Sequence, residues 1–279
     1  MIVDAHHHFW DPTRAAYPWM TNDLAKIRRP FGPADLEPEL RRYGVARTIV
    51  VQGRADLDET RELLATAAVT DFLAGVIGWI DLTHADAAQT IAELKTLTGG
   101  TKLVGIRHQL HDEPDPAWLL RDDVQRGLAA VGASGLAYDL LVRTRELPAA
   151  LETARRFPGM RFVIDHIAKP SIRDGRGTRA WAQAMAPFRE LANVSCKLSG
   201  MVTEADWTRW QPQDLAPYVD QVLDWFGSGR CLFGSDWPVC LLAADYGQVL
   251  DAVRTVLDRL DAAATENVLA GTAARVYQL

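Results

Sequence analysis

The sequence predicts an α/β fold in which a single (β/α)8 barrel occupies residues 1–279. Eight short runs rich in β-branched residues each precede an amphipathic stretch, an alternation typical of a parallel sheet covered by helices. Runs such as 48–51 and 73–77 are apolar on both faces, as buried parallel strands are. The length is close to the roughly 250 residues that such a barrel uses. An open doubly wound sheet is disfavoured, because no glycine-rich phosphate loop follows the first run.

The expected elements follow one another in a regular order. Polar or glycine residues bound each expected strand; the strands cover residues 2–6, 48–52, 73–80, 103–107, 136–141, 161–166, 194–198 and 231–235. Apolar residues recur with a helical period between them. The expected helices cover residues 33–43, 57–70, 85–97, 117–131, 146–156, 178–191, 214–226 and 246–260. A last helix is expected at 262–269, before a C-terminal tail.

The connection after the first strand, residues 9–32, is unusually long and aromatic. It contains Trp10, Tyr17, Trp19 and Phe31. Loops of this length in compact domains are usually functional, and this one leaves the strand end where barrel active sites lie. We expect it either to cover the barrel mouth as a hydrophobic cluster or to contact the substrate as a lid, and the two roles are compatible.

Composition and charge disfavour several kinds of partner. Thirty Lys and Arg against 36 Asp and Glu leave a net charge of −6 without a basic stripe, which argues against nucleic-acid binding. The longest apolar stretch, 72–80, is far shorter than the roughly 20 residues of a membrane span. The three cysteines do not indicate a disulfide framework. The N-terminal residues show no basic stretch leading into a long apolar run, so we do not expect secretion. We therefore expect a cytoplasmic enzyme with a small-molecule substrate, and the sequence indicates no oligomeric state.

Histidines cluster at the end of the first expected strand. Alternation along the strand predicts that Ile2, Asp4, His6 and His8 share one face. A leftover affinity tag is disfavoured, because the histidines continue the strand without a linker. Two imidazoles two residues apart at a strand end can converge on one ion or one water, and neutral imidazole is a common ligand of zinc.

A second histidine follows an apolar strand later in the chain. Alternation predicts that Phe162, Ile164 and His166 share a face, so that His166 approaches the barrel axis from the opposite wall. The alternative is a core histidine whose hydrogen bonds are satisfied within the protein.

An aspartate ends the last expected strand. Alternation predicts that Leu232, Gly234 and Asp236 point together, and the glycine leaves room beside the carboxylate. The alternative role for Asp236 is a helix N-cap, but Pro238 and the apolar residues after it postpone the next helix.

The ends of parallel barrel strands face one pocket, so these four side chains are expected to meet there. The set, which suits hydrolysis, comprises His6, His8, His166 and Asp236. An aspartate can take a proton from water, and imidazoles, with or without a metal, can stabilise charge that develops on a carbonyl oxygen. A bound divalent ion would also lower the pKa of its water to about 7.

Several motifs in the chain together resemble one enzyme superfamily. They are DAHHHFWDP at 4–12, GIRH at 105–108, IDHIAKP at 164–170, CKLSG at 196–200 and GSDWP at 234–238. In this pattern the chain resembles the amidohydrolase superfamily, and within it the "amidohydrolase 2" lactonase branch. That branch contains L-fucono- and L-rhamnono-lactonases and pyrone-dicarboxylate lactonase. The resemblance covers nearly the whole chain and is specific for the branch rather than for a substrate.

The resemblance implies a barrel that hydrolyses a cyclic ester. Asp236 would be the general base, and His6, His8 and His166 would bind a metal together with Asp236 or polarise the lactone carbonyl. Members with two metals carry a carboxylated Lys or a Glu at the end of the fourth strand, where this chain has Arg107 and a histidine. We therefore expect one divalent ion, with zinc the first choice. Some members work without metal, so its requirement stays open.

Five further side chains at or near strand ends are expected to contact the substrate: Arg107, His108, Gln52, Lys169 and Trp237. A guanidinium suits a carboxylate or vicinal hydroxyls, and an indole can stack on a sugar ring. The alternatives are an ion pair for Arg107, a solvated loop position for Lys169, and packing for Gln52 and Trp237.

The preferred substrate is a sugar-acid lactone, resembling L-fucono-1,5-lactone, from carbohydrate metabolism. The same pocket would also suit an aromatic-catabolic lactone, such as a pyrone dicarboxylate or a muconolactone, or a related decarboxylation. A catalytically silent binding protein is disfavoured, because binding alone does not need an inward carboxylate among imidazoles.

Overall fold

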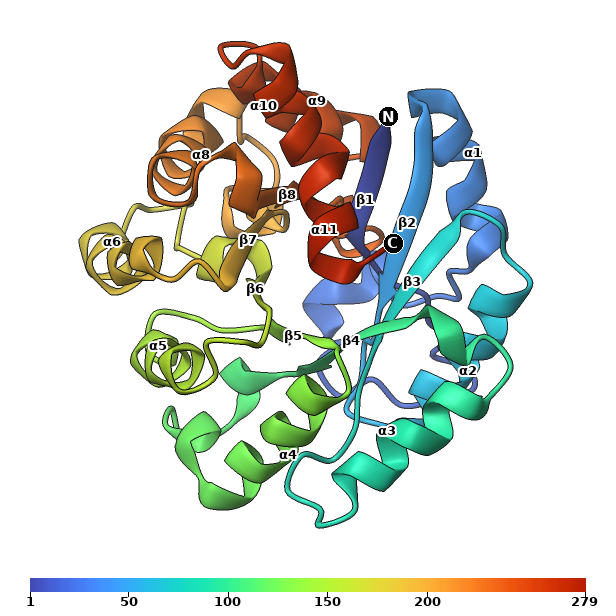
Figure 1. Cartoon of the computed structure of the whole chain (residues 1–279). Coiled ribbons are helices and arrows are strands. Elements are labelled where there is room, and N and C mark those ends of the chain that lie inside the picture. Colours follow the sequence, from blue (N-terminus) through green and yellow to red (C-terminus); the bar gives the residue numbers. More distant parts are fainter.

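The computed structural model describes residues 1–279 and confirms the (β/α)8 barrel. Eight parallel strands form one sheet in sequence order, with the helices outside it (Figure 1). The strands are β1 (Ile2–His7), β2 (Val45–Val51), β3 (Leu73–Gly78), β4 (Leu103–His108), β5 (Ala137–Leu140), β6 (Phe162–Ile164), β7 (Val194–Leu198) and β8 (Cys231–Phe233). A parallel bridge between His7 and Trp237 links β1 to the end of β8, and His8 N donates to Trp237 O at 2.7 Å.

Every predicted strand–helix pair is present. The α-helices are α1 (Pro33–Tyr43), α2 (Leu57–Ala68), α3 (Ala87–Thr96), α4 (Asp122–Ala133), α5 (Leu147–Arg156), α6 (Thr178–Met185), α7 (Met201–Glu204), α8 (Pro212–Phe226), α9 (Tyr246–Leu257), α10 (Ala262–Glu266) and α11 (Thr272–Tyr277). The predicted helix at 117–131 is a 3-10 turn, η4 (Trp118–Leu120), followed by α4, and the one at 178–191 is α6 followed by η6 (Ala186–Glu190).

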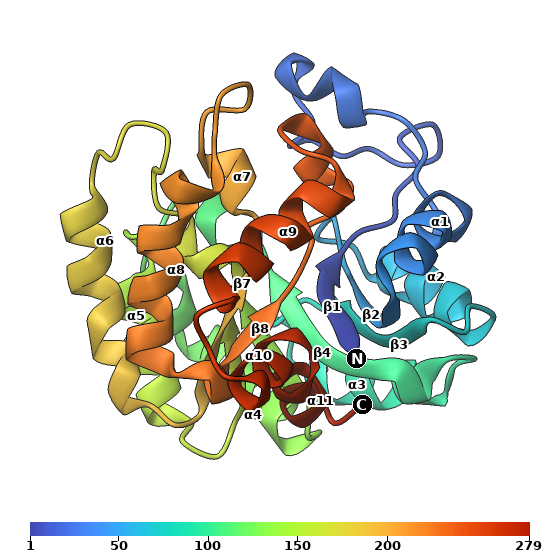
Figure 2. The same cartoon turned by 90° about the horizontal axis from the view of Figure 1, so that it is seen from above.

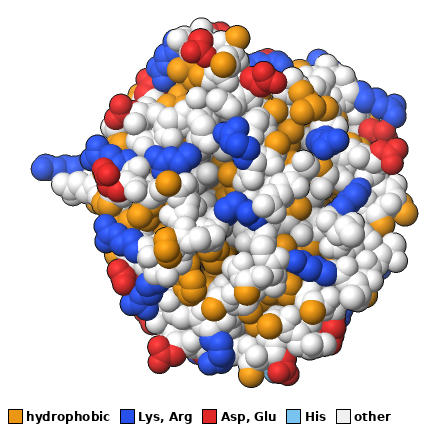
Figure 3. Space-filling view, in the orientation of Figure 1, with side chains coloured by type: hydrophobic (Ala, Val, Ile, Leu, Met, Phe, Trp, Pro, Cys, Tyr) orange, Lys and Arg blue, Asp and Glu red, His pale blue; other side chains and the backbone are white.

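The predicted C-terminal tail is wrong. A π-helical turn, η9 (Asn267–Gly271), follows α10 and leads into α11. Ala270, Ala273 and Tyr277 pack on the side chains that fill the barrel interior, which are Val3, Ala5, Ile49, Val51, Ile77, Ala137, Val163 and Leu232. The C-terminal segment therefore closes the end of the barrel where both termini lie (Figure 2). The space-filling view in the orientation of Figure 1 shows this face of the molecule filled by side chains (Figure 3).

The long segment between β1 and α1 lies over the opposite end of the barrel (Figure 2). It contains a 3-10 helix, η1 (Asn22–Ile27), and Trp10 Nε1 donates to Ile27 O at 3.1 Å. Phe31 packs against Trp10 and Trp237, with ring centroids 6.0 and 5.2 Å away. This segment is thus a packed aromatic cover over the barrel mouth. No helix of the chain has the length and hydropathy needed to cross a bilayer.

Candidate active site

A β-bulge in β1 decides which of its side chains enter the barrel. Val3 and Ala5 belong to the interior cluster. The register of the pairing with β2 then shifts. Asp4 pairs with Thr48 and His7 pairs with Val50, so that three residues along β1 correspond to two residues along β2. The extra residue breaks the alternation, and it turns His6 inward directly after Ala5.

Asp4 supports the site from outside the barrel. Its carboxylate accepts hydrogen bonds from Ser235 N at 2.9 Å, Ser235 Oγ at 2.6 Å and the Tyr246 hydroxyl at 3.0 Å. Burial raises the pKa of Asp4 to about 6. The predicted shared face of Ile2 and Asp4 with the two histidines is therefore wrong, and Asp4 instead ties β1 to the segment that carries Asp236.

His166 reaches the site by a backbone turn rather than by strand alternation. Val163 fills the barrel interior, whereas Phe162 and Ile164 pack in the outer core. Asp165 occupies the next inward position, so the predicted shared face of Ile164 and His166 is wrong. His166 has a left-handed backbone, with φ of 53°, which swings its ring into the pocket.

Asp236 also follows its strand in a left-handed conformation, with φ of 56°. Leu232 points into the barrel, and Asp236 N donates to His6 O at 2.8 Å. A Cβ at Gly234 would lie 2.7 Å from the Cβ of His6. The close approach of β8 to β1 therefore requires the glycine that the sequence places there.

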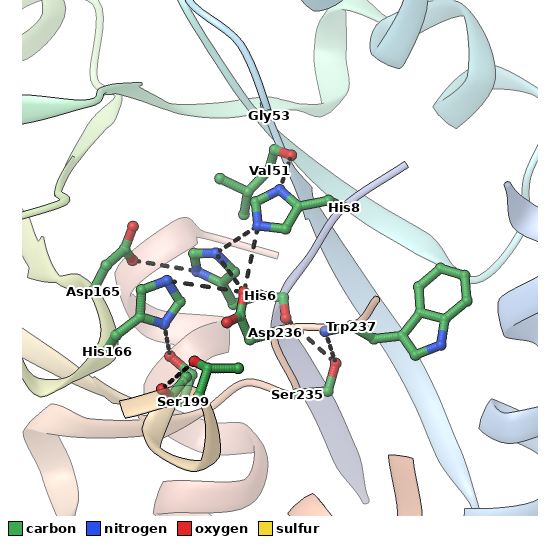
Figure 4. Close-up of polar contacts among 12 residues, drawn as sticks. His6, His8, Val51, Gly53, Asp165, His166, Ser199, Ser235, Asp236 and Trp237 are labelled. Atoms are coloured by element: carbon green, nitrogen blue, oxygen red, sulfur yellow. Dashed lines mark hydrogen bonds and ion pairs between the residues drawn. The ribbon is translucent and has the colours of Figure 1, made fainter. Parts of the chain in front are cut away.

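The structure brings the four predicted residues together (Figure 4). Asp236 Oδ1 lies 3.8 Å from His6 Nε2, 3.5 Å from His8 Nε2 and 3.9 Å from His166 Nε2. All four side chains are buried. The Nε2 atoms of three imidazoles thus converge on one carboxylate oxygen.

Outer hydrogen bonds set the orientation of two of these rings. His8 Nδ1 lies 2.7 Å from Val51 O, and a carbonyl only accepts, so His8 carries a proton on Nδ1 and a lone pair on Nε2 when neutral. His166 Nδ1 is 2.9 Å from Ser199 Oγ, which leaves its Nε2 toward Asp236. Both outer contacts therefore present Nε2 to the centre of the site.

This donor set fits a single metal ion. One ligand atom each from His6, His166 and Asp236 lie within 4.8 Å of one another, and His8 Nε2 is 3.2 Å from His6 Nε2. A tetrahedral zinc with bonds of about 2.0–2.2 Å separates its ligands by about 3.3–3.6 Å. The distances of 3.5–3.9 Å from Asp236 Oδ1 to the three Nε2 atoms are slightly longer than these separations, and the donor set could hold one divalent ion.

Electrostatics favour an ionised aspartate among neutral imidazoles. Burial raises the pKa of Asp236, but the neighbouring His166 and His8 outweigh burial and bring it below its usual value. Burial lowers the pKa of His166 to about 4 and holds that of His6 well below its usual value. At neutral pH the site therefore offers a carboxylate that can accept a proton and imidazoles that carry lone pairs.

A cavity of about 150 Å³ opens above these groups. Its lining comprises His8, Trp19, Gly53, Arg107, Gln109, His111, Asp112, Leu141, His166, Lys169, Asp236 and Val239. Arg107 and Lys169 were predicted to lie here. Trp19 belongs to the long segment that was expected to cover the barrel mouth or contact the substrate. Gln109, His111 and Asp112 were not predicted, because their segments are irregular and strand alternation says nothing about them.

Three predicted substrate contacts lie away from this cavity. Gln52 is behind Arg107 and accepts from its Nη2 at 3.0 Å. His108 stacks on Trp118 at 4.3 Å and contacts Glu113 through Nε2 at 2.7 Å, in a neighbouring hollow. Trp237 packs in the aromatic cover. These three residues do not line the cavity, and their contact with a substrate stays a prediction.

Beneath the site lies a buried ionic cluster that the sequence reasoning missed. It consists of Arg107, Asp139, Asp165 and Lys197. The signal available was a charged residue within each of the otherwise apolar strands β5 and β7. Alternation alone left the direction of Lys197 open.

A (β/α)8 barrel with three imidazoles and an aspartate at the carboxyl ends of its strands defines a class of hydrolases that often use a metal. The chain belongs to the amidohydrolase family, whose model, described as "Amidohydrolase", matches residues 3–279. This membership confirms the family predicted from the motifs.

Two curated relatives carry the same name. The L-fucono-1,5-lactonase of Burkholderia ambifaria is 43% identical over 99% of this chain and 95% of its own length. The L-fucono-1,5-lactonase of Burkholderia multivorans is 41% identical over 99% of this chain and 96% of its own. A solved amidohydrolase structure from Burkholderia multivorans, described with bound zinc, is 39% identical with a TM-score of 0.95, and covers 100% of this chain and 99% of its own.

Proposed function

We propose that this amidohydrolase opens a sugar-acid lactone, with L-fucono-1,5-lactone or a close analogue as substrate. The observation that carries the proposal is the ionised Asp236 beside three Nε2 atoms on the floor of a small cavity. The two lactonase relatives match almost the full length of the chain and support the substrate class.

The site supplies a general base for the attacking water and groups that act on the lactone carbonyl. Asp236 accepts a proton from the attacking water, whose oxygen forms a bond to the lactone carbonyl carbon. The C–O bond of the ring then breaks, and Asp236 is placed to return the proton to the leaving ring oxygen. His6, His8 and His166 turn Nε2 toward the same point, where they would act on the carbonyl oxygen through a bound metal ion that stabilises the developing charge. The product is the open hydroxy acid.

We propose one zinc ion held by His6, His166 and Asp236, with His8 adjacent. When bound, zinc supplies Lewis acidity toward the carbonyl and lowers the pKa of a bound water. The zinc-bound relative supports this choice of ion.

The charges around the cavity favour a neutral substrate over a dicarboxylate. Arg107 Nη1 is 3.1 Å from Asp165, and Lys169 Nζ is 2.7 Å from Glu204, so both cations already have partners. A pyrone dicarboxylate would need free cations at the mouth. Hydroxyls of a sugar lactone can instead share the donors of these paired groups and of Gln109. The proposed substrate places the reaction in carbohydrate breakdown, for which a cytoplasmic site remains a prediction.

The test is proton release from a panel of five- and six-membered sugar lactones, measured for the wild-type protein and for Asp236→Asn. Loss of the general base should lower kcat by roughly 10²–10⁴-fold, with an unchanged circular dichroism spectrum. Asp58→Asn, an exposed carboxylate on α2, serves as the matched control and should keep wild-type rates.

Full activity of Asp236→Asn would rule out the assigned base. A wild-type protein that opens no lactone in the panel would overturn the substrate class. Repeating the screen after chelation and after adding zinc back should show loss and recovery of activity. Unchanged rates after verified zinc removal would overturn the metal proposal alone.

A further inference from the structure

Four consecutive residues after β6 have a left-handed backbone. The φ values of His166, Ile167, Ala168 and Lys169 are 53°, 49°, 60° and 50°, and none of the four is a glycine. A residue with a side chain meets a steric penalty in this conformation, so the turn persists only because the surrounding structure holds it. We call residues 166–169 the left-handed turn.

The core of the protein holds the left-handed turn in place through its two middle residues. Ile167 and Ala168 are fully buried in the outer core. Trp181 on α6 donates from its indole Nε1 to Ile167 O at 2.7 Å. The two end residues, His166 and Lys169, both line the cavity above the site. The anchored middle of the turn therefore presents its two ends to the substrate.

Placing His166 alone does not require so long a turn. Asp236 reaches the same site with one left-handed residue, at φ of 56°. In the left-handed turn, Lys169 N donates to His166 O at 2.8 Å. A hydrogen bond between residues three apart brings their side chains onto one side of the turn. The three residues after His166 thus carry the Lys169 side chain to the cavity beside the imidazole.

The Lys169 ammonium has donors left over at this cavity. An ammonium has three N–H donors and no acceptor. The side chain is 15% exposed, and its only ion-pair partner is Glu204, whose Oε1 lies 2.7 Å from Nζ. This pairing neutralises the charge of Lys169 but uses one donor. Two N–H groups remain for oxygen atoms of a ligand, and leaving such largely buried donors unpaired is unfavourable.

The neighbours of Lys169 indicate which substrate atom it contacts. His166 Nε2 faces the centre of the site, 3.9 Å from Asp236 Oδ1, so the ammonium beside His166 lies next to the reacting carbonyl. Two groups flank a lactone carbonyl, which are the ring oxygen and the substituent on the adjacent carbon, C2. The ring oxygen gains negative charge as the ring opens, and the Glu204 carboxylate disfavours such charge nearby. A hydroxyl on C2 stays neutral and can accept from the ammonium.

We propose that Lys169 is a specificity-determining residue that donates a hydrogen bond to the hydroxyl on C2, so that the enzyme selects lactones hydroxylated next to the carbonyl. This inference rests on the proposed lactonase function and narrows its substrate class to 2-hydroxy lactones. Sugar-acid lactones with a hydroxyl at C2 meet the requirement, whereas 2-deoxy lactones do not. A site built to bond a hydroxyl rejects an analogue without it, because a buried polar group is then left unpaired.

The first measurement needs neither turnover nor a variant. The 1,5-lactam of L-fuconic acid is a cyclic amide with the shape of the lactone, and calorimetry can compare its binding with that of its 2-deoxy derivative in the presence of zinc. We expect wild-type protein to bind the 2-deoxy lactam about 10–100-fold more weakly than the parent lactam. Equal affinities, or no binding of the parent lactam, would overturn the proposal.

The second measurement removes the ammonium. Lys169→Met should lower affinity for the parent lactam and for a 3-deoxy lactam by about 10–100-fold, and should leave affinity for the 2-deoxy lactam at the wild-type value. An equal loss for all three lactams would show a purely structural role and contradict the proposal.

Lys102→Met is the matched control for this change. Lys102 is a half-buried lysine that directly precedes β4, at the end of the barrel opposite the cavity, and its Nζ donates to Ala67 O at 2.7 Å. Its replacement removes the same charge far from the substrate. All three lactams should therefore bind Lys102→Met with wild-type affinity.

Lactone hydrolysis separates this inference from the proposed function. Wild-type kcat/KM should favour the 2-hydroxy lactone over its 2-deoxy analogue by about 10–100-fold, and Lys169→Met should remove the preference. If no lactone is hydrolysed at all, the proposed function fails, while lactam binding still decides the role of Lys169.

Discussion

His166 and Asp236 show at the scale of single residues how this site is made. Both have left-handed backbone, with φ of 53° and 56°, which costs a residue other than glycine roughly 1–2 kcal/mol. Each follows a short strand, and the turn redirects its side chain toward the barrel mouth. Such strain is characteristic of functional sites, where the surrounding structure holds it.

Gly200 limits the space behind the His166 ring. It has φ of 61°, and a Cβ there would lie 2.5 Å from His166 Nδ1. Gly200→Ala should displace the imidazole and lower kcat/KM by at least about 10-fold, since small misplacement of a reacting group is costly. Gly135→Ala is the control, because Gly135 has φ of 72° with open space around it. Comparable rates for both variants would contradict the steric role.

At the scale of elements, Glu59 on α2 anchors the turn after β2 to the long segment over the barrel mouth. Its Oε2 accepts from Gly53 N at 2.8 Å and Arg54 N at 2.9 Å, and its Oε1 accepts from the Tyr17 hydroxyl at 3.2 Å. Trp19 Nε1 then donates to Gly53 O at 2.7 Å. One buried carboxylate thus places both the turn and the aromatic wall of the cavity.

This anchor makes stability depend on pH. Burial raises the pKa of Glu59 to about 7, well above its usual value of 4.5. Between these values the folded state binds a proton that the unfolded state has lost, so stability falls as pH rises. The contribution is up to about 1.4 kcal/mol per pH unit. Denaturant unfolding from about pH 5 to 7 should show a steeper decline for wild type than for Glu59→Gln. Parallel curves would contradict the raised pKa.

At the scale of the whole molecule, the two ends of the chain meet around the barrel axis. Strand β1 carries its histidines at its carboxyl end, at the barrel mouth. The last helix, α11, closes the other end of the barrel, where β1 begins. Tyr277 reaches the ionic cluster and donates to Asp139 Oδ1 at 2.9 Å. The C-terminal helix therefore completes the buried polar layer below the active site.

Removing the Tyr277 hydroxyl should destabilise the fold. Tyr277→Phe leaves Asp139 without one of its donors, and hydrogen bonds to charged groups contribute about 1.5–3 kcal/mol. We expect the free energy of unfolding in urea to fall by about that amount. Tyr138→Phe is the control, because the buried Tyr138 hydroxyl has no hydrogen-bond partner, and this change should cost almost nothing. A larger loss for Tyr138→Phe would contradict the assignment.

The sequence predicted the barrel and the four central side chains because both depend on local patterns. Strand β7 has the predicted bounds, whereas β6 and β8 end two residues before their predictions. Their last predicted residues are at or next to His166 and Asp236, where left-handed backbone ends the strand. The prediction that alternate residues of a strand share one face assumes a regular backbone. It was therefore wrong at those turns and at the bulge in β1.

The sequence by itself determined the closed cylinder of alternating elements, the amidohydrolase family, and the residues at the strand ends that meet in one pocket. Those features follow from periodicity and motifs, which are properties of short stretches of consecutive residues. Only the tertiary structure decided that Asp165 and Lys197 contact His6, that Gln52, His108 and Trp237 lie outside the cavity, and that the C-terminal segment closes the barrel. Contacts between side chains far apart in the chain depend on register, bulges and turns, whose effects no local pattern records.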